Sequence, residues 1–172
     1  ETVARFEAEH GHDVKAFLQA VRWQTGIEDI GVGLTSSDIV DTGLALQVRQ
    51  ALLLVYDRVC ALRDKLVQMS RNIGDVVIMG RTHGQDAEPI TVGQMLLVYA
   101  DDLLDCADVL CGLASSARGK LSGPVGTHTH ISPELERIAL GKLDLEGGPA
   151  LQSVSRLWLA RVAGELANLA SV

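Results

Sequence analysis

The stretch SDIVDTGLALQVRQALLLVYDRVCALRDKLVQMSRN, residues 37–72, decides the fold. Its apolar residues recur at steps of three and four, the spacing of one face of an α-helix. A second apolar stripe is offset by two residues and lies on roughly the opposite side, since two residues turn a helix by about 200°. A helix of about 35 residues cannot bury two faces within a small monomer, so we expect an all-α bundle of long helices forming an oligomeric core. The first stripe is Leu44, Val48, Leu52, Val55, Val59, Leu62, Leu66 and Met69, and the second is Leu46, Leu53, Cys60 and Val67.

The other segments also indicate helices, joined by glycine-rich loops. Residues 91–116 carry an apolar stripe at helical spacing opposite a polar face rich in aspartate. A serine followed by a proline at 132–133 predicts the start of a short helix that ends near residue 143. A last helix is expected over 159–172. The run Val76–Met79 is β-like and leads into a polar loop.

Composition narrows the possible partners and the compartment. Apolar residues make up 47% of the 172-residue chain but aromatic residues only 3%, so the core is expected to consist of aliphatic side chains. The net charge of −7 argues against nucleic acid or an anionic membrane surface as a partner. We find no signal peptide and no apolar run expected to span a bilayer. The cysteines at 60, 106 and 111 are too few and too buried in pattern for a disulfide framework, which favours the reducing cytoplasm.

The most informative polar segment is GRTHGQDAEP at 80–89, which places His83 between glycines, in a loop that joins two long helical stretches. Loops on a rigid scaffold often display reactive side chains, and histidine is suited to proton transfer near neutral pH. Three further polar segments accompany it, each at the edge of a helical stretch: His12-Asp13, Thr35–Asp38 and 119–127. The alternative is a turn histidine without a chemical role.

Taken together, four motifs resemble those of adenylosuccinate lyases, a family of the fumarase/aspartase superfamily, in their order and spacing. They are HDVKAF at 12–17, GLTSSDIVDTGL at 33–44, GRTHGQDAEP at 80–89 and GKLSGPVGT at 119–127. The resemblance implies a homotetramer with a long-helix bundle and active sites shared between subunits. It also implies a β-elimination that releases fumarate from a succinyl-amino substrate, adenylosuccinate or SAICAR, in purine nucleotide biosynthesis. No cofactor is implied.

The resemblance assigns the catalytic histidines. His83, beside Thr82, matches the general acid that protonates the departing nitrogen, which is a poor leaving group without a proton. His12 and Asp13 match the pair that binds substrate and orients the acid. Without the resemblance, His12 would be read as a solvated helix histidine.

The resemblance also implies a set of groups that bind the anionic substrate. Hydroxyls at 35–37 precede a helix N-terminus, where N–H groups favour anions. The second glycine-rich loop lets backbone approach a ligand closely, although its lysine could equally be a solvated charge. N-capping by Ser37 or Asp38 is compatible with this role. The substrate-binding candidates are Asp13, Thr35, Ser36, Ser37, Thr82, Gln85, Lys120, Ser122, Gln152 and Arg156.

Two departures from the family pattern qualify these expectations. No segment of the chain matches the serine loop that supplies the family's catalytic base, and both ends of the chain fall within helical patterns. We therefore expect a piece of a longer protein: residues 1–34 as the end of an N-terminal helical domain and 35–172 as part of the central bundle domain. In addition, Leu157 and Trp158 stand where relatives usually carry a charged pair after Gln152 and Arg156. Another superfamily lyase, a carboxymuconate cycloisomerase-like enzyme and a catalytically incomplete helical assembly fragment are the alternatives.

The histidines also raise the question of a metal site. His10 and His12 form one His-x-His pair, and His128 and His130 form another. Residues two apart on a helix point about 200° apart, and no cysteine or third close ligand frames either pair. We therefore expect no metal.

Overall fold

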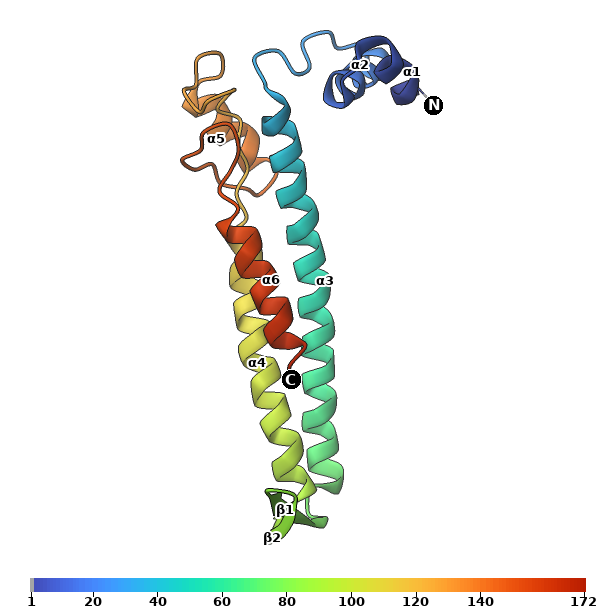
Figure 1. Ribbon diagram of the computed structural model, residues 1–172, viewed down its shortest axis with the longest axis vertical. Coiled ribbons are helices and arrows are strands. Elements are labelled where there is room, and N and C mark those ends of the chain that lie inside the picture. Colours follow the sequence, from blue (N-terminus) through green and yellow to red (C-terminus); the bar gives the residue numbers. More distant parts are fainter. Residues whose placement is uncertain (1) are drawn as a thin grey trace. The chain divides into compact units, whose positions relative to one another are not determined.

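The computed structural model describes residues 2–172, and α-helices dominate it. Figure 1 shows the elements along the chain. The helices are α1 (Thr2–His10), α2 (Asp13–Thr25), α3 (Ser36–Ile73), α4 (Val92–Ser115), α5 (Pro133–Gly141) and α6 (Leu157–Leu169), and the strands are β1 (Val77–Thr82) and β2 (Gln85–Thr91). The expected long helices at 37–72 and 91–116 are therefore confirmed as α3 and α4.

The chain divides into two compact units that share α3. The first unit comprises residues 1–47 and 117–155, and the second comprises residues 48–116 and 156–172. Neither unit begins or ends at residue 34, where we expect the domain boundary. The expected division into domains stays a prediction.

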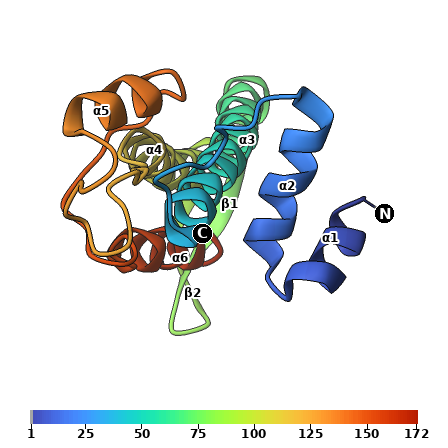
Figure 2. The same cartoon turned by 90° about the horizontal axis from the view of Figure 1, so that it is seen from above.

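The first unit contains a small helical pair followed by loops. Helices α1 and α2 pack together through Phe6, Ala16 and Ala20, and Figure 2 shows α1 beside α2. Helix α2 ends at Gly26, whose positive φ of 72° is the left-handed conformation common at helix C-termini. The chain then reaches the start of α3 through a loop that Arg22 anchors, by donating from Nε and Nη2 to the carbonyl oxygen of Ile30 at 2.9 and 2.7 Å.

The second unit holds the main apolar core, where α4 and α6 pack on α3 beyond Val48. Two members of the first predicted stripe, Leu52 and Val59, are buried there. The second stripe is less covered, since Leu53 is 40% exposed. The buried core consists of Leu52, Val59, Leu103, Ala107, Leu110, Leu113, Ala114 and Val162.

The polar loop expected between the long helices is instead mostly a β-hairpin. Strands β1 and β2 pair antiparallel from Val77 opposite Thr91 to Thr82 opposite Gln85, with a register shift beside Gly80. A side chain on Gly80 would place its Cβ 2.6 Å from the carbonyl oxygen of Glu88, so the bulge requires glycine. The polar residues at 81–88 had obscured the strand pairing, because the hairpin is exposed and lacks an alternating apolar face.

The expectation that the cysteines are buried was wrong for Cys111, and a single helix bears on the expectation of no membrane span. Helix α3 is long and apolar enough, by length and composition, to cross a membrane. One such helix is weak evidence for a membrane span, because the central helix of a bundle passes the same test. Cys111 is exposed, whereas Cys106 is buried and Cys60 is intermediate.

Candidate active site

The start of α2 and the start of α3 bring two of the sequence motifs together in the first unit. His12 occupies the N-cap position of α2 with extended backbone, φ −152° and ψ 117°. Its Nε2 lies 3.4 Å from Oγ of Ser36, the first residue of α3, and its Nδ1 lies 3.2 Å from Oδ1 of Asp13. The ring of His12 therefore lies between a hydroxyl and a carboxylate and is not a freely solvated helix histidine, and its buried Nδ1 makes no hydrogen bond within residues 2–172.

The start of α3 is organised by Asp38. The N–H of Thr35 donates to Oδ2 of Asp38 at 2.9 Å, and the N–H of Asp38 donates to the carbonyl oxygen of Thr35 at 3.0 Å. This resembles one half of a capping box, in which an acidic residue in the first turn accepts from the residue before the helix. Asp38 thus acts from within the helix, which leaves the hydroxyls at 35–37 free of that capping role.

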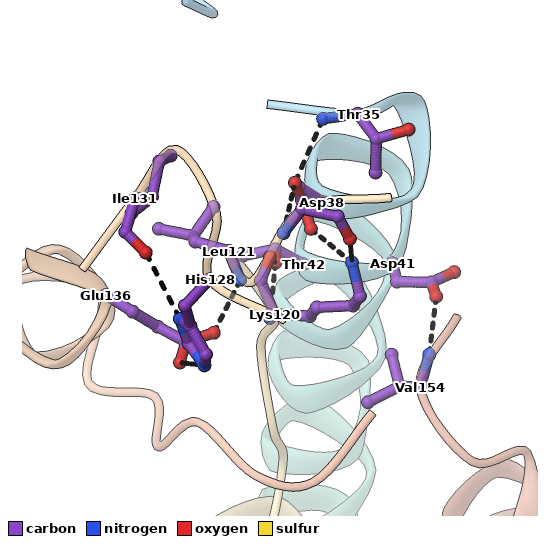
Figure 3. A network of polar contacts seen from close by, with 11 residues as sticks. Thr35, Asp38, Asp41, Thr42, Lys120, Leu121, His128, Ile131, Glu136 and Val154 are labelled. Atoms are coloured by element: carbon purple, nitrogen blue, oxygen red, sulfur yellow. Dashed lines mark hydrogen bonds and ion pairs between the residues drawn. The ribbon is translucent and has the colours of Figure 1, made fainter. Parts of the chain in front are cut away.

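The lysine of the glycine-rich loop forms a buried ion pair with Asp38. Lys120 Nζ donates to Asp38 Oδ1, and both side chains are 0% exposed (Figure 3). Nζ also donates to the carbonyl oxygen of Gly123 at 2.6 Å. The interpretation of Lys120 as a solvated charge is wrong, because Lys120 is buried and paired with Asp38. Asp38 lies far away in the sequence, so the residues around Lys120 gave no sign of this partner.

Two more side chains, those of Thr42 and Glu136, fix the backbone of the same loop (Figure 3). Thr42 Oγ1 accepts from the N–H of Lys120 at 2.9 Å and donates to its carbonyl oxygen at 3.0 Å. Glu136 accepts from the N–H of Leu121 at 2.7 Å and lies 3.6 Å from His128 Nε2. The loop is therefore held by side chains of α3 on one side and of α5 on the other.

Ser122 lies at the centre of this loop. Its carbonyl oxygen accepts from the N–H of His128 at 3.0 Å. Its Oγ is buried and, within residues 2–172, has no hydrogen-bond partner. A buried hydroxyl without a partner is costly, so Ser122 is a reasonable group to meet a ligand.

Sequence reasoning missed four residues that build this arrangement. They are Asp38, Thr42, His128 and Glu136. Asp38 was interpreted only as a cap, although its place in the TSSD motif was a usable signal. Thr42 lies in the same motif and His128 in a His-x-His pair, but the roles of Thr42, His128 and Glu136 could not be read locally because their contacts join different segments.

His83 belongs to the second unit and forms the turn of the hairpin. His83 and Gly84 have φ of 52° and 75°, the pair of positive values that a type I′ turn requires. Thr82 and Gln85 pair across the strand ends, and all four of these residues are exposed. The turn therefore presents the imidazole at the tip of the hairpin.

The remaining candidates are divided between the two units. Gln152 is an exposed loop residue of the first unit, and Arg156 precedes α6 in the second. In the first unit the structure brings together His12, Asp13 and Ser36. It also joins Thr35 to Lys120 through Asp38 in that unit. The other unit contains the remaining candidates Thr82, His83, Gln85 and Arg156. Among residues 2–172, no group of three histidine, cysteine, aspartate or glutamate side chains is arranged to hold a metal ion.

Comparison with known proteins finds relatives in the family that the sequence motifs resemble. A family model described as "Lyase" matches residues 8–161. The adenylosuccinate lyase of Synechocystis sp. is 41% identical over 99% of this chain and 41% of its own length, and that of Aquifex aeolicus is 37% identical over 87% of this chain and 35% of its own length. The adenylosuccinate lyase of Bacillus subtilis is 33% identical over 99% of this chain and 40% of its length. The chain thus spans about two fifths of these relatives.

The fold has a solved counterpart. A crystal structure of fumarate lyase from Mesorhizobium sp. BNC1 superposes with a TM-score of 0.87, at 24% identity, over 99% of this chain and 42% of that one. At that identity the likeness shows the fold alone, and it confirms the expected long-helix architecture.

Proposed function

Because the chain belongs to this lyase family, within the fumarase/aspartase superfamily, we propose that it forms part of a C–N lyase of the adenylosuccinate lyase type. The substrate is an anionic succinyl-amino compound, adenylosuccinate or SAICAR. The reaction breaks the bond between nitrogen and the succinyl carbon and releases fumarate. The relatives named as adenylosuccinate lyases favour this substrate over those of other superfamily members.

The contact between His12 and Ser36 is the observation that carries the proposal. It joins the HD motif to the hydroxyl segment at the start of α3, 24 residues further along the chain. Hydroxyls and free N–H groups at a helix N-terminus suit a carboxylate or phosphate. From this grouping we propose that several side chains bind the substrate, namely those of Asp13, Thr35, Ser36, Ser37 and Ser122.

In the proposed reaction, a base removes the proton from the carbon that becomes part of the double bond. The electron pair of that C–H bond forms the C=C bond of fumarate as the C–N bond breaks. His83 donates a proton to the departing nitrogen, with Thr82 and Gln85 beside it at the ends of the paired strands. The chain thus contributes the acid side of the elimination, and Gln152 and Arg156 are proposed to bind the substrate.

The proposed enzyme is a soluble, cytoplasmic homotetramer whose sites combine residues from several subunits. An isolated two-stranded hairpin is only marginally stable in water, and this one exposes Val77 and Met79. A groove of about 730 Å³ on the second unit is lined mainly by apolar side chains, among them Leu54, Leu62 and Leu66. Both features favour burial against further helices.

Fumarate release tests the proposal. The full natural polypeptide, incubated with adenylosuccinate, is expected to release fumarate, detected by ultraviolet absorbance, together with one equivalent of AMP. Release of fumarate only from a different succinyl compound would instead identify another superfamily lyase. Absence of release from every succinyl-amino compound, by a folded and assembled protein, would contradict the proposed function and favour a helical assembly role.

A further inference from the structure

The Asp38–Lys120 pair lies between two of the segments to which the proposed function assigns substrate binding. Both side chains are completely buried. Removing two charges from water costs free energy that their attraction regains only with good geometry and further hydrogen bonds, and an apolar pair of similar volume is often at least as stable. Stability alone is therefore a weak reason for this ion pair.

The carboxylate of Asp38 joins three separate groups. Oδ1 accepts from Lys120 Nζ, while Oδ2 accepts from the N–H of Thr35 at 2.9 Å and from the N–H of Gly123 at 3.2 Å (Figure 3). One side chain thus links the residue before α3 to two points of the glycine-rich loop. Any displacement of this carboxylate moves both segments relative to each other.

The ammonium of Lys120 is buried and bonded to two acceptors within the protein. Nζ donates to Asp38 and to the carbonyl oxygen of Gly123, and no part of the side chain is exposed. An ammonium has three N–H donors, and burial prevents the third from reaching a ligand in this conformation. A substrate anion would have to displace Asp38 to reach Nζ.

We propose that Asp38 and Lys120 are positioning residues of the proposed lyase site and that Lys120 does not bind the substrate. The pair holds the hydroxyls of Thr35 and Ser36 at a fixed spacing from the loop that carries Ser122, whose Oγ is buried without a partner within residues 2–172. The role in catalysis rests on the proposed function, whereas the positioning itself does not.

Asp38→Asn distinguishes positioning from direct substrate binding by the sign of its effect. The amide keeps the shape of the side chain, but its NH₂ cannot accept a hydrogen bond. Depending on which oxygen it replaces, either Lys120 Nζ or the N–H groups of Thr35 and Gly123 lose their acceptor. In the full natural polypeptide we expect the KM for adenylosuccinate to rise about tenfold or more, with a smaller change in kcat. If Lys120 bound the substrate, loss of its counter-ion would free the ammonium, and an unchanged or lower KM would overturn the proposal. Glu134→Gln is the control, because Glu134 is exposed and pairs with the nearby Arg137, which is exposed as well, and its KM should stay within about twofold.

A double variant separates positioning from a purely structural role. Asp38→Leu combined with Lys120→Met removes both charges, so neither is left buried without a partner. We expect it to recover most of the melting temperature lost in Asp38→Asn and in Lys120→Met while its KM stays raised. Recovery of KM together with the melting temperature would overturn the proposal.

Amide hydrogen exchange tests the positioning without any turnover. The amides of Thr35 and Gly123 should be protected in the wild type and should exchange about tenfold faster or more in Asp38→Ala, whose methyl group accepts no hydrogen bond from them. The amide of Leu121, which donates to Glu136, is the internal control and should be unchanged. Equal exchange of Thr35 and Gly123 in both proteins would overturn the proposal. If their exchange changes as expected but the wild type releases no fumarate from adenylosuccinate, the positioning stands and the proposed function fails.

Discussion

The indole Nε1 of Trp158 donates a hydrogen bond of 2.9 Å to the carbonyl oxygen of Leu113, in the last turn of α4. The last carbonyls of a helix have no partner within it, so the indole satisfies one of them. The Trp158 side chain also packs on the apolar core of the second unit. The indole of Trp158 therefore has a structural role in the second unit.

Trp158→Phe should lower the free energy of unfolding by about 1–2 kcal/mol, because the indole hydrogen bond and part of the packing are lost while Ser116 still donates to the Leu113 carbonyl oxygen. Denaturant unfolding followed by circular dichroism measures the change. Trp23→Phe is the matched control, since Trp23 is 68% exposed, and it should stay within about 0.5 kcal/mol of the wild type. Equal effects of the two substitutions would show that the indole bond is not a stabilising feature.

Leu53→Asp should disrupt self-association. Leu53 belongs to the second apolar stripe of α3 and is 40% exposed in the single chain, so assembly would bury a carboxylate there without a partner. Light scattering at micromolar concentration should show loss of the oligomer. Gln47→Asp adds the same charge at an exposed polar position of α3, about 120° around the helix from Leu53, and should leave assembly intact. A wild type that is already a stable monomer would refute the assembly proposal.

Ser36→Ala and Thr35→Ala should each weaken substrate binding while the fold is kept. A hydrogen bond to a charged group contributes about 1.5–3 kcal/mol, which corresponds to a rise in KM of roughly ten- to a hundredfold. Steady-state kinetics and circular dichroism on the same preparation measure both quantities. Unchanged kinetics in both variants would leave these hydroxyls with no role beyond the start of α3.

Cys106 should resist alkylation. Burial, and then its contact with Glu165, raise the pKa of the Cys106 thiol. The folded state therefore favours the neutral thiol, and the pKa difference makes folding less stable as the pH rises through the ordinary cysteine range near 8.5. Iodoacetamide labelling at pH 8, followed by mass spectrometry, should modify Cys106 at least about tenfold more slowly in the folded than in the urea-unfolded chain. Equal rates would contradict this environment.

Helical periodicity was sufficient to predict the long helices, and the residue types at helix starts predicted two N-caps, those of α4 and α5. Thr91 Oγ1 accepts from the N–H of Gln94 at 3.1 Å, and Ser132 Oγ accepts from the N–H of Leu135 at 3.2 Å, as expected for residues at helix starts. These features depend on residues three or four apart, and the sequence shows such neighbours directly. The exact helix ends were less accurate: α5 ends at Gly141 and α6 at Leu169.

Contacts between distant segments could not be predicted in the same way. The motif at 119–127 marked Lys120 as important, but nothing near it in the sequence indicates that Asp38 neutralises it. The meeting of His12 with Ser36 likewise depends on how the loop after α2 folds. The hairpin was missed because His83-Gly84 is not one of the dipeptides that usually mark a type I′ turn.

The most direct test of the proposed mechanism is the kcat of His83→Gln, measured with the melting temperature on one preparation of the full natural polypeptide. His83 is exposed at the tip of the hairpin, so assembly should be kept, and the melting temperature should fall only slightly because glutamine adopts the positive φ of this turn less readily than histidine. Loss of a general acid should lower kcat by about 10²–10⁴-fold, with little change in KM. A variant that is less stable but turns over adenylosuccinate at the wild-type rate would remove His83 from the mechanism.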